Sequence, residues 1–182
     1  RVFPEERITR IQGDWRYWQC SRPCHDKIYY NKEETFKLYE KIENDALPDN
    51  LIPRCPHCGA ELAPWVRSYT FLQGEFYRQE MKRYMEFLHS NAHRNTLFLE
   101  LGVGMMTPMF IKEPFMNMVY QWPNAFYVTL NPQHAIIPKE IKKKSLAISD
   151  DIAITLKQLL GESTIGMKGF DAKEAFNPSR VY

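Results

Sequence analysis

The sequence predicts an α/β chain that combines part of a parallel sheet with a small four-cysteine zinc-ribbon module. In residues 96–162, short apolar segments alternate with helical ones. This alternation is typical of parallel strands joined by right-handed helical crossovers. All four cysteines lie in residues 1–66, in two closely spaced pairs. The two patterns together indicate a metal-stapled module followed by a sheet.

The region before residue 96 is expected to contain two helices. The first is predicted over Lys32–Asn44, with Phe36, Tyr39 and Ile42 on one face. The second lies within residues 67–95, where apolar side chains recur at helical spacing. That stripe is interpreted as core, and it consists of Phe76, Tyr77, Met81, Tyr84, Met85 and Leu88.

The region from residue 96 onward is expected to hold the strands. They are predicted over residues 97–101, 126–130 and 145–148, with a helical segment over 114–120. A last helix follows, for which we expect Ser149 to be the N-cap and Asp150-Asp151 to form the first turn. Gly161 is expected to end it.

Composition and charge exclude several classes of function. The 182 residues carry a formal net charge of only +2, which gives no electrostatic reason to expect nucleic acid. The basic run over Lys139–Lys144 is interpreted as a solvated helix face or loop. The most apolar stretch, Leu97–Ile111, is too short to cross a bilayer, and no signal peptide is recognised. We therefore expect no membrane partner, a cytoplasmic location and reduced cysteines.

The cysteine spacing indicates a structural zinc site. Cys20 and Cys24 are separated by three residues, and Cys55 and Cys58 stand in the motif CPHCG. Four thiolates suit a tetrahedral zinc ion, and Gly59 permits the tight turn of the second knuckle. We therefore expect one zinc ion per chain, held by Cys20, Cys24, Cys55 and Cys58. A closed four-thiolate site has no open position, so this zinc is a staple and the chemistry lies elsewhere.

Other uses of these cysteines stay open. An iron–sulfur cluster would take the same ligands. A redox dithiol needs only one pair, and neither pair is predicted at a strand-to-helix turn. His25 and His57 lie beside ligands and could replace one of them.

A glycine turn in the predicted sheet suggests a nucleotide site. A strand leads into Gly102-Val103-Gly104 and then a helix, a geometry that can hold phosphate or ribose. Asn131 ends the next strand, where its side chain would face the same crevice. Each feature also has a simpler interpretation: a tight turn for the glycines, and turn chemistry before Pro132 for Asn131.

The order of these motifs resembles the sirtuin family over about residues 8–160. A zinc ribbon precedes PWVRSYTFLQGE, then a strand, GVGMMTP, a helix, and a strand that ends in TLNPQ. The resemblance implies that the sheet is part of the Rossmann-like sheet of the sirtuin fold. It also implies that the adenosine half of NAD is contacted by Gly102, Val103, Gly104, Asn131 and Ile152. Gly74-Glu75 matches the Gly-Glu of the family, on the substrate side.

Two departures from the common family pattern are informative. Sirtuins carry a catalytic histidine before a glycine, just upstream of the first zinc cysteine, and this sequence has Gln12-Gly13 there. A neutral amide cannot act as a general base and can only hold a hydroxyl by hydrogen bonds. The turn is also GVG where common members have GTS. Both features resemble the class M sirtuins, which are associated with macrodomain proteins.

That resemblance implies NAD-dependent protein ADP-ribosyltransferase activity, with Gln12 at the catalytic position and in contact with NAD. The expected acceptor is a lipoylated, glycine-cleavage-H-like carrier protein, with a macrodomain protein as a possible further partner. Arg67 could meet the acidic surface of the acceptor, or form an ordinary surface salt bridge. The alternatives are an NAD-dependent lysine deacylase and a non-catalytic zinc-ribbon binding module.

The resemblance also implies a division of the chain. Residues 1–14 would end the first half of the Rossmann-like domain and hold the catalytic loop, and residues 15–66 would form the zinc-binding domain. Residues 67–162 would be the second half of the NAD-binding domain, and 163–182 an irregular tail. Because no Gly-Ala-Gly-type loop is found, we expect the first half of the NAD site to be missing and this chain alone to be inactive.

Overall fold

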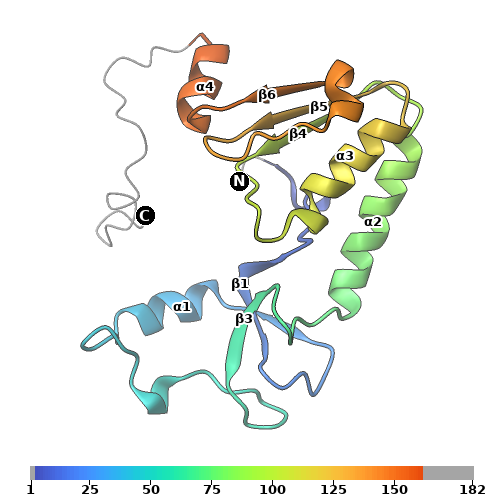
Figure 1. Ribbon diagram of the computed structural model, residues 1–182. Coiled ribbons are helices and arrows are strands. Elements are labelled where there is room, and N and C mark those ends of the chain that lie inside the picture. Colours follow the sequence, from blue (N-terminus) through green and yellow to red (C-terminus); the bar gives the residue numbers. More distant parts are fainter. Residues whose placement is uncertain (1–2, 162–182) are drawn as a thin grey trace. The chain divides into compact units, whose positions relative to one another are not determined.

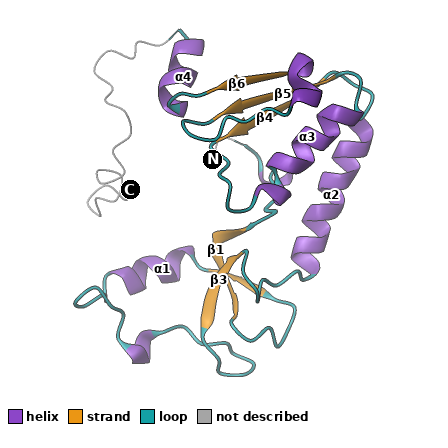
Figure 2. Ribbon diagram, viewed as in Figure 1, coloured by secondary structure: helices purple, strands orange, loops and turns teal. Residues whose placement is uncertain are grey.

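The computed structural model describes residues 3–161 of the chain (Figure 1). The chain forms two compact units that divide between His89 and Ser90. Each unit has its own three-stranded sheet, and Figure 2 shows the strands and helices of both. The units are described separately below.

The first unit is built on an antiparallel sheet of order β2-β1-β3. These strands cover Gly13–Cys20 (β1), Ile28–Tyr30 (β2) and Leu62–Val66 (β3). Gly13 pairs with Val66, and the register shifts between Asp14 and Trp18. An aromatic core centres on Trp65, which is fully buried and contacts Tyr17, Phe71, Phe76 and Tyr77. Each aromatic ring of this size buries a large apolar area, so these rings dominate the core of a small sheet.

The first helix of this unit is shorter than predicted. Helix α1 covers Lys32–Tyr39 and ends well before Asn44. Asn44 and Asp45 both have positive φ, and Glu43 forms a β-bridge with Ala46, so a tight turn replaces the expected last helical turns. Asparagine and aspartate tolerate this left-handed conformation better than other side chains, which explains the early end. A short 3₁₀ turn follows at Asp49–Leu51.

The second helix, α2, covers Glu75–Asn91. Of its predicted core stripe, Leu88 is buried, whereas the side chain of Met85 is 44% exposed. A charged residue, Glu80, is buried on this helix at 2% exposure. The apolar pattern therefore located the helix correctly but missed its most deeply buried side chain.

The second unit contains a parallel sheet of order β4-β5-β6, as predicted. The strands cover Thr96–Leu101 (β4), Ala125–Leu130 (β5) and Ser145–Ile148 (β6). Leu101 pairs with Leu130, and Leu130 with Ile148, so all three strands end at one edge. The loops that follow β4 and β5, and the start of the last helix, gather at this carboxyl edge.

Helix α3 covers Lys112–Gln121 and packs on the sheet through aromatic rings. The ring centroids of Phe98 and Phe115 lie 5.0 Å apart. Lys144, at the end of a 3₁₀ helix over Lys139–Lys144, does not extend into solvent as the basic run predicted. Its ammonium donates to the carbonyls of Val119 and Trp122, because the last carbonyls of α3 lack helical partners.

The last helix, α4, covers Ile152–Leu159, and its predicted cap was wrong. The N-cap is Asp151, whose side chain accepts a hydrogen bond of 2.9 Å from the backbone N–H of Ile154. Ser149 does not have this role, since the helix begins three residues after it. Gly161, with a φ of 72°, follows the helix end as expected.

The mixed α/β class with a parallel sheet and a four-cysteine module is thus confirmed. Among residues 3–161, no helix has both the length and the apolar character needed to span a membrane. The tail expected over 163–182 lies outside the described residues.

Candidate functional site

The four cysteines form one cluster in the first unit. The Sγ atoms of Cys20 and Cys58 lie 3.5 Å apart, and those of Cys24 and Cys55 lie 3.6 Å apart. All four sulfur atoms lie within 4.8 Å of one another. Sulfurs around a tetrahedral zinc ion, each about 2.3 Å from the metal, would be about 3.8 Å apart. The cluster therefore has the dimensions of a closed zinc site, and each short contact joins the two halves of the motif.

The ionisation of these thiols also suits a cation. Burial would raise the pKa of Cys55, but hydrogen bonds with the backbone N–H groups of His57 and Cys58 and with the side chains of Cys24 and His25 together lower this pKa to about 6. Desolvation and hydrogen bonds to the other three sulfurs raise the pKa of Cys24 to about 12. Because the pKa of Cys24 is raised while that of Cys55 is lowered, a positive ion is needed to hold both of these groups as thiolates together. Zinc would supply that charge and stabilise the fold.

His25 lies beside the cluster and supports it. Its Nε2 atom lies 3.4 Å from the Sγ of Cys55 and 2.8 Å from the hydroxyl of Tyr29. Its Nδ1 accepts a 3.1 Å hydrogen bond from the N–H of Lys27, which places the ring proton on Nε2. The ring can thus donate toward a thiolate, a supporting role common around zinc sites, while the ligand set remains four cysteines.

The Gln12-Gly13 corner is built by backbone contacts. The N–H of Gly13 donates to the carbonyl of Arg10 at 3.0 Å, and the carbonyl of Gln12 accepts from the N–H of Arg67 at 2.9 Å. Gly13 has a φ of 84°, and a Cβ there would lie 2.0 Å from the carbonyl oxygen of Trp65. Only glycine fits this position, so the corner before β1 has one defined shape.

Arg67 is directed at this same corner. Its guanidinium donates to the carbonyl of Ile11 at 2.6 Å and to the hydroxyl of Tyr77 at 3.0 Å. It also lies over the ring of Phe71, 4.2 Å from the centroid. Arg67 therefore holds the backbone at Ile11 and Gln12 through its guanidinium and its own N–H. A contact with an acceptor protein stays a prediction.

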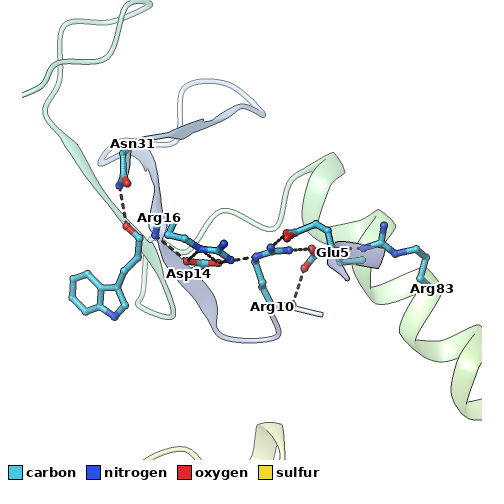
Figure 3. Close-up of polar contacts among 8 residues, drawn as sticks. Glu5, Arg10, Asp14, Arg16, Asn31 and Arg83 are labelled. Atoms are coloured by element: carbon cyan, nitrogen blue, oxygen red, sulfur yellow. Dashed lines mark hydrogen bonds and ion pairs between the residues drawn. The ribbon is translucent and has the colours of Figure 1, made fainter. Parts of the chain in front are cut away.

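A charged network adjoins the corner, and Figure 3 shows Arg10 between Glu5 and Asp14. Arg10 is 5% exposed, and its guanidinium pairs with Glu80, with Glu5 and, at 2.8 Å, with Asp14. The backbone N–H of Arg10 also donates to Glu80 at 2.7 Å. Burial alone would raise the pKa of Asp14, but hydrogen bonds from Arg16 and Arg10 outweigh it and lower this pKa to about 2. These pairs satisfy the buried charges and join the residues before β1 to helix α2.

Gly74 and Glu75 lie at the start of α2, against the zinc module. The carboxylate of Asp26 accepts hydrogen bonds of 3.1 and 3.0 Å from the N–H of Glu75, and so caps the helix from a distant loop. A Cβ on Gly74 would lie 1.8 Å from an oxygen of that carboxylate. Arg78 pairs with both Asp26 and Glu75. The Gly-Glu pair therefore has a structural reason here, and a role in substrate binding stays a prediction.

The residues predicted for the adenosine half of NAD come together in the second unit. The N–H of Gly102 donates to the carbonyl of Leu130 at 3.0 Å, and a Cβ on Gly102 would lie 3.1 Å from the side chain of Ile152. Gly102 has a φ of 70°, which bends the chain sharply away from β4. The amide nitrogen of Asn131 donates to the carbonyl of Val103 at 3.1 Å. Gly104 follows in the same turn, and no described residue beyond its chain neighbours lies within 4 Å of the place where its Cβ would be.

Asn131 organises the loop after β5. It is 5% exposed, and its side-chain oxygen accepts from the N–H groups of Gln133 and His134 at 3.0 and 2.9 Å. Both interpretations of Asn131 thus have a basis, because the side chain makes the turn and also contacts the glycine turn. Gln12 and Arg67 belong to the other unit, so the predicted site residues form two groups, each described by itself.

Three polar residues that support these sites were not predicted from the sequence. Asp26 caps α2, Arg10 supports the Gln12 corner, and Gln19 holds residues 70–72 through bonds to the carbonyl of Thr70 and the N–H of Leu72. Gln19 is 1% exposed. The available signal for Gln19 was its position on β1 directly between Trp18 and the predicted zinc ligand Cys20.

Comparison with known proteins found relatives described as ADP-ribosyltransferases and solved structures described as sirtuins. No protein-family model matches the chain. It is 30% identical over 155 residues to a "Protein ADP-ribosyltransferase" of Staphylococcus aureus (strain Mu50 / ATCC 700699), covering 84% of this chain and 49% of the relative. It is 24% identical over 169 residues to a "Probable bifunctional ADP-ribose hydrolase/ADP-ribosyltransferase" of Fusarium oxysporum f. sp. cubense, covering 87% and 28%. The chain thus spans less than half the length of these relatives.

The similar solved structures are sirtuins. One is described as "The Structural basis for Sirtuin Substrate affinity", with 18% identity, a TM-score of 0.48, and coverage of 84% of this chain and 56% of that one. Another is described as "Sir2-p53 peptide-NAD+", with 15% identity, a TM-score of 0.46, and coverage of 82% and 52%. The descriptions of these matches name the family that the sequence resembles.

Proposed function

We propose that this chain is the zinc-binding and C-terminal part of an NAD-dependent protein ADP-ribosyltransferase of the sirtuin type, within class M. The observation that carries the proposal is the corner at Gln12-Gly13, held in shape by its backbone contacts, where this sequence has a glutamine in place of the family's histidine. The similarity to the Staphylococcus relative supports the same activity.

The candidate site residues have different roles in binding NAD. The amide of Gln12 holds a ribose hydroxyl by hydrogen bonds and takes up no proton near neutral pH. The turn at Gly102–Gly104, with Asn131 and Ile152, holds the adenosine half of NAD. NAD itself supplies an ADP-ribosyl group on a good leaving group, nicotinamide. Transfer needs that group to be oriented toward a nucleophile, whereas deacylation also needs a base, which Gln12 cannot be.

The finer elements of the proposal follow the family resemblance. The acceptor is a lipoylated, glycine-cleavage-H-like carrier protein, a macrodomain protein is a further partner, and the reaction takes place in the cytoplasm. Arg67, Gly74 and Glu75 lie on the side of the acceptor. Because the chain spans about half of the bacterial relative, we propose that activity requires the full-length protein.

The test is an assay of the full-length protein with NAD and a lipoylated carrier protein, read by mass spectrometry of the carrier. We expect transfer of ADP-ribose to the carrier and little release of acyl groups from acylated peptides. Efficient lysine deacylation without transfer would contradict the proposal and favour the deacylase alternative. Binding of the carrier without any turnover of NAD would favour a non-catalytic binding module.

A substitution isolates the role of Gln12. Replacing Gln12 by His restores a group that can take up a proton, and a positioned general base contributes on the order of 10²-fold or more. We therefore expect Gln12→His to raise the deacylase rate strongly. Gln158→His, at an exposed position of helix α4, is the matched control and should leave that rate unchanged.

A further inference from the structure

A buried polar cluster adjoins the carboxyl edge of the parallel sheet in the second unit. The ammonium of Lys112 donates to Oε1 of Glu100, and the hydroxyl of Thr129 donates to the same oxygen at 3.0 Å. The hydroxyl of Tyr127 donates to Oε2 of Glu100. Glu100 and Lys112 are 1% and 2% exposed. Every oxygen of this carboxylate is thus satisfied without water.

Lys112 lies at an unfavourable position if its only role is to stabilise the fold. It is the first residue of helix α3, where the helix dipole disfavours a cation. Buried ion pairs are often no more stabilising than apolar side chains of similar volume. An apolar residue could not, however, bond several acceptors at once, as an ammonium with three N–H groups can. This capacity is used here, because Nζ also donates to the carbonyl of His134 at 3.1 Å.

The segments joined by Lys112 are those of the candidate adenosine site. Glu100 lies two residues before Gly102, at the end of β4. His134 lies in the loop after β5, where its N–H donates to Asn131 and its carbonyl accepts from Lys112. Asn131 in turn contacts Val103. The glycine turn and the loop after β5 are therefore connected both through Asn131 and through Lys112 with Glu100.

We propose that Lys112 is a positioning residue of the adenosine site, fixing the glycine turn and the loop after β5 in one geometry. This inference rests on the proposed function, since the site is the one assigned to NAD. Lys112 is too deeply buried to touch the ligand and acts through Glu100 and the backbone of His134. Glu100 neutralises the ammonium and anchors it to β4.

The test compares two variants of the full-length protein, with ADP-ribose as the probe. Lys112→Met leaves the carboxylate of Glu100 buried and uncompensated, so it should lose both thermal stability and affinity. The double variant Glu100→Gln with Lys112→Met buries no charge, and the new side-chain amide can still pair with both hydroxyls, because its oxygen accepts from one and its NH2 group donates to the other. It should recover most of the stability, while the Kd for ADP-ribose stays about tenfold weaker, because a hydrogen bond from a charged donor is lost. Its KM for NAD should rise more than its kcat falls.

One control variant and two contrary outcomes test the role of Lys112. Lys142→Met removes an exposed lysine of the same unit and should change neither stability nor affinity. If the double variant recovers affinity together with stability, the pair only stabilises the fold and the positioning role is wrong. If the unsubstituted protein binds neither ADP-ribose nor NAD, the proposed function fails and this inference fails with it.

Discussion

Replacing Gly13 by alanine tests whether the corner before β1 has one permitted shape. Gly13 has a φ of 84°, a region that costs an L-residue about 1–2 kcal/mol. The new Cβ would also lie 2.0 Å from the carbonyl oxygen of Trp65, where ordinary contact needs at least 3.4 Å. Strands β1 and β3 would have to move apart, and such overpacking costs typically about 1–3 kcal/mol. The sum is a loss of about 2–5 kcal/mol, a large share of the stability of an ordinary domain.

The assay is urea unfolding of the full-length protein, with the free energy of unfolding taken from the midpoint and slope. Gly161→Ala is the matched control, because Gly161 has a φ of 72° and no described residue beyond its chain neighbours lies within 4 Å of the place where its Cβ would be. It should lose only the conformational contribution, about 1–2 kcal/mol. Equal losses in the two variants would refute the steric argument and, with it, the claim that the Gln12 corner is rigidly shaped.

Three further predictions concern the metal, the helix cap and acid stability. Cys55→Ser should lower the zinc content, measured by metal analysis, from about one ion per chain to nearly none; a full complement of zinc would disprove the four-thiolate site. Asp26→Ala should lower the free energy of unfolding by about 1 kcal/mol, because Glu75 loses its capping carboxylate, and an unchanged urea midpoint would show that the cap contributes nothing. Because the pKa of Asp14 is lowered to about 2, its stabilisation is complete above its unfolded pKa of about 4 and is lost as the pH falls toward 2. Asp14→Asn should therefore be less stable than the native protein at pH 6 by about 1 kcal/mol after solvent screening, and should show a flatter stability profile between pH 5 and 2; parallel profiles would contradict the assignment.

The features predicted correctly from the sequence are those encoded over short distances. Strand β4 shows an apolar run with a glycine turn directly after it, and its bounds differ by one residue from the prediction. The cysteine pairs carry their ligand spacing within a few residues, and the four sulfurs do cluster. Patterns of this kind need no knowledge of distant partners.

The start of helix α4 was harder to predict, because three neighbouring residues can each serve as its N-cap. Ser149, Asp150 and Asp151 are all good N-cap residues. The choice depends on where β6 stops, and the carbonyl of Ile148 is still bonded to the N–H of Asn131 in the sheet. The helix consequently begins after Asp151.

The polar supports of the sites could not be predicted from one sequence. Arg10 and Glu80 are 70 residues apart along the chain, and Gln19 and Thr70 are 51 apart. Their residue types show only that they are polar. Which polar groups are buried together depends on the packing of β1 against α2 and the segment after β3.

The cap on α2 also sets an order of assembly. Asp26 and Glu75 are 49 residues apart, and contacts over such separations form late in folding. Asp26 lies two residues after Cys24, in the loop that closes when the four sulfurs come together. The first turn of α2 should therefore gain protection from amide hydrogen exchange only after the zinc ribbon has closed. The amides of residues 75–78 lie outside the cysteine cluster. Their hydrogen-exchange rates would then show when the metal has bound.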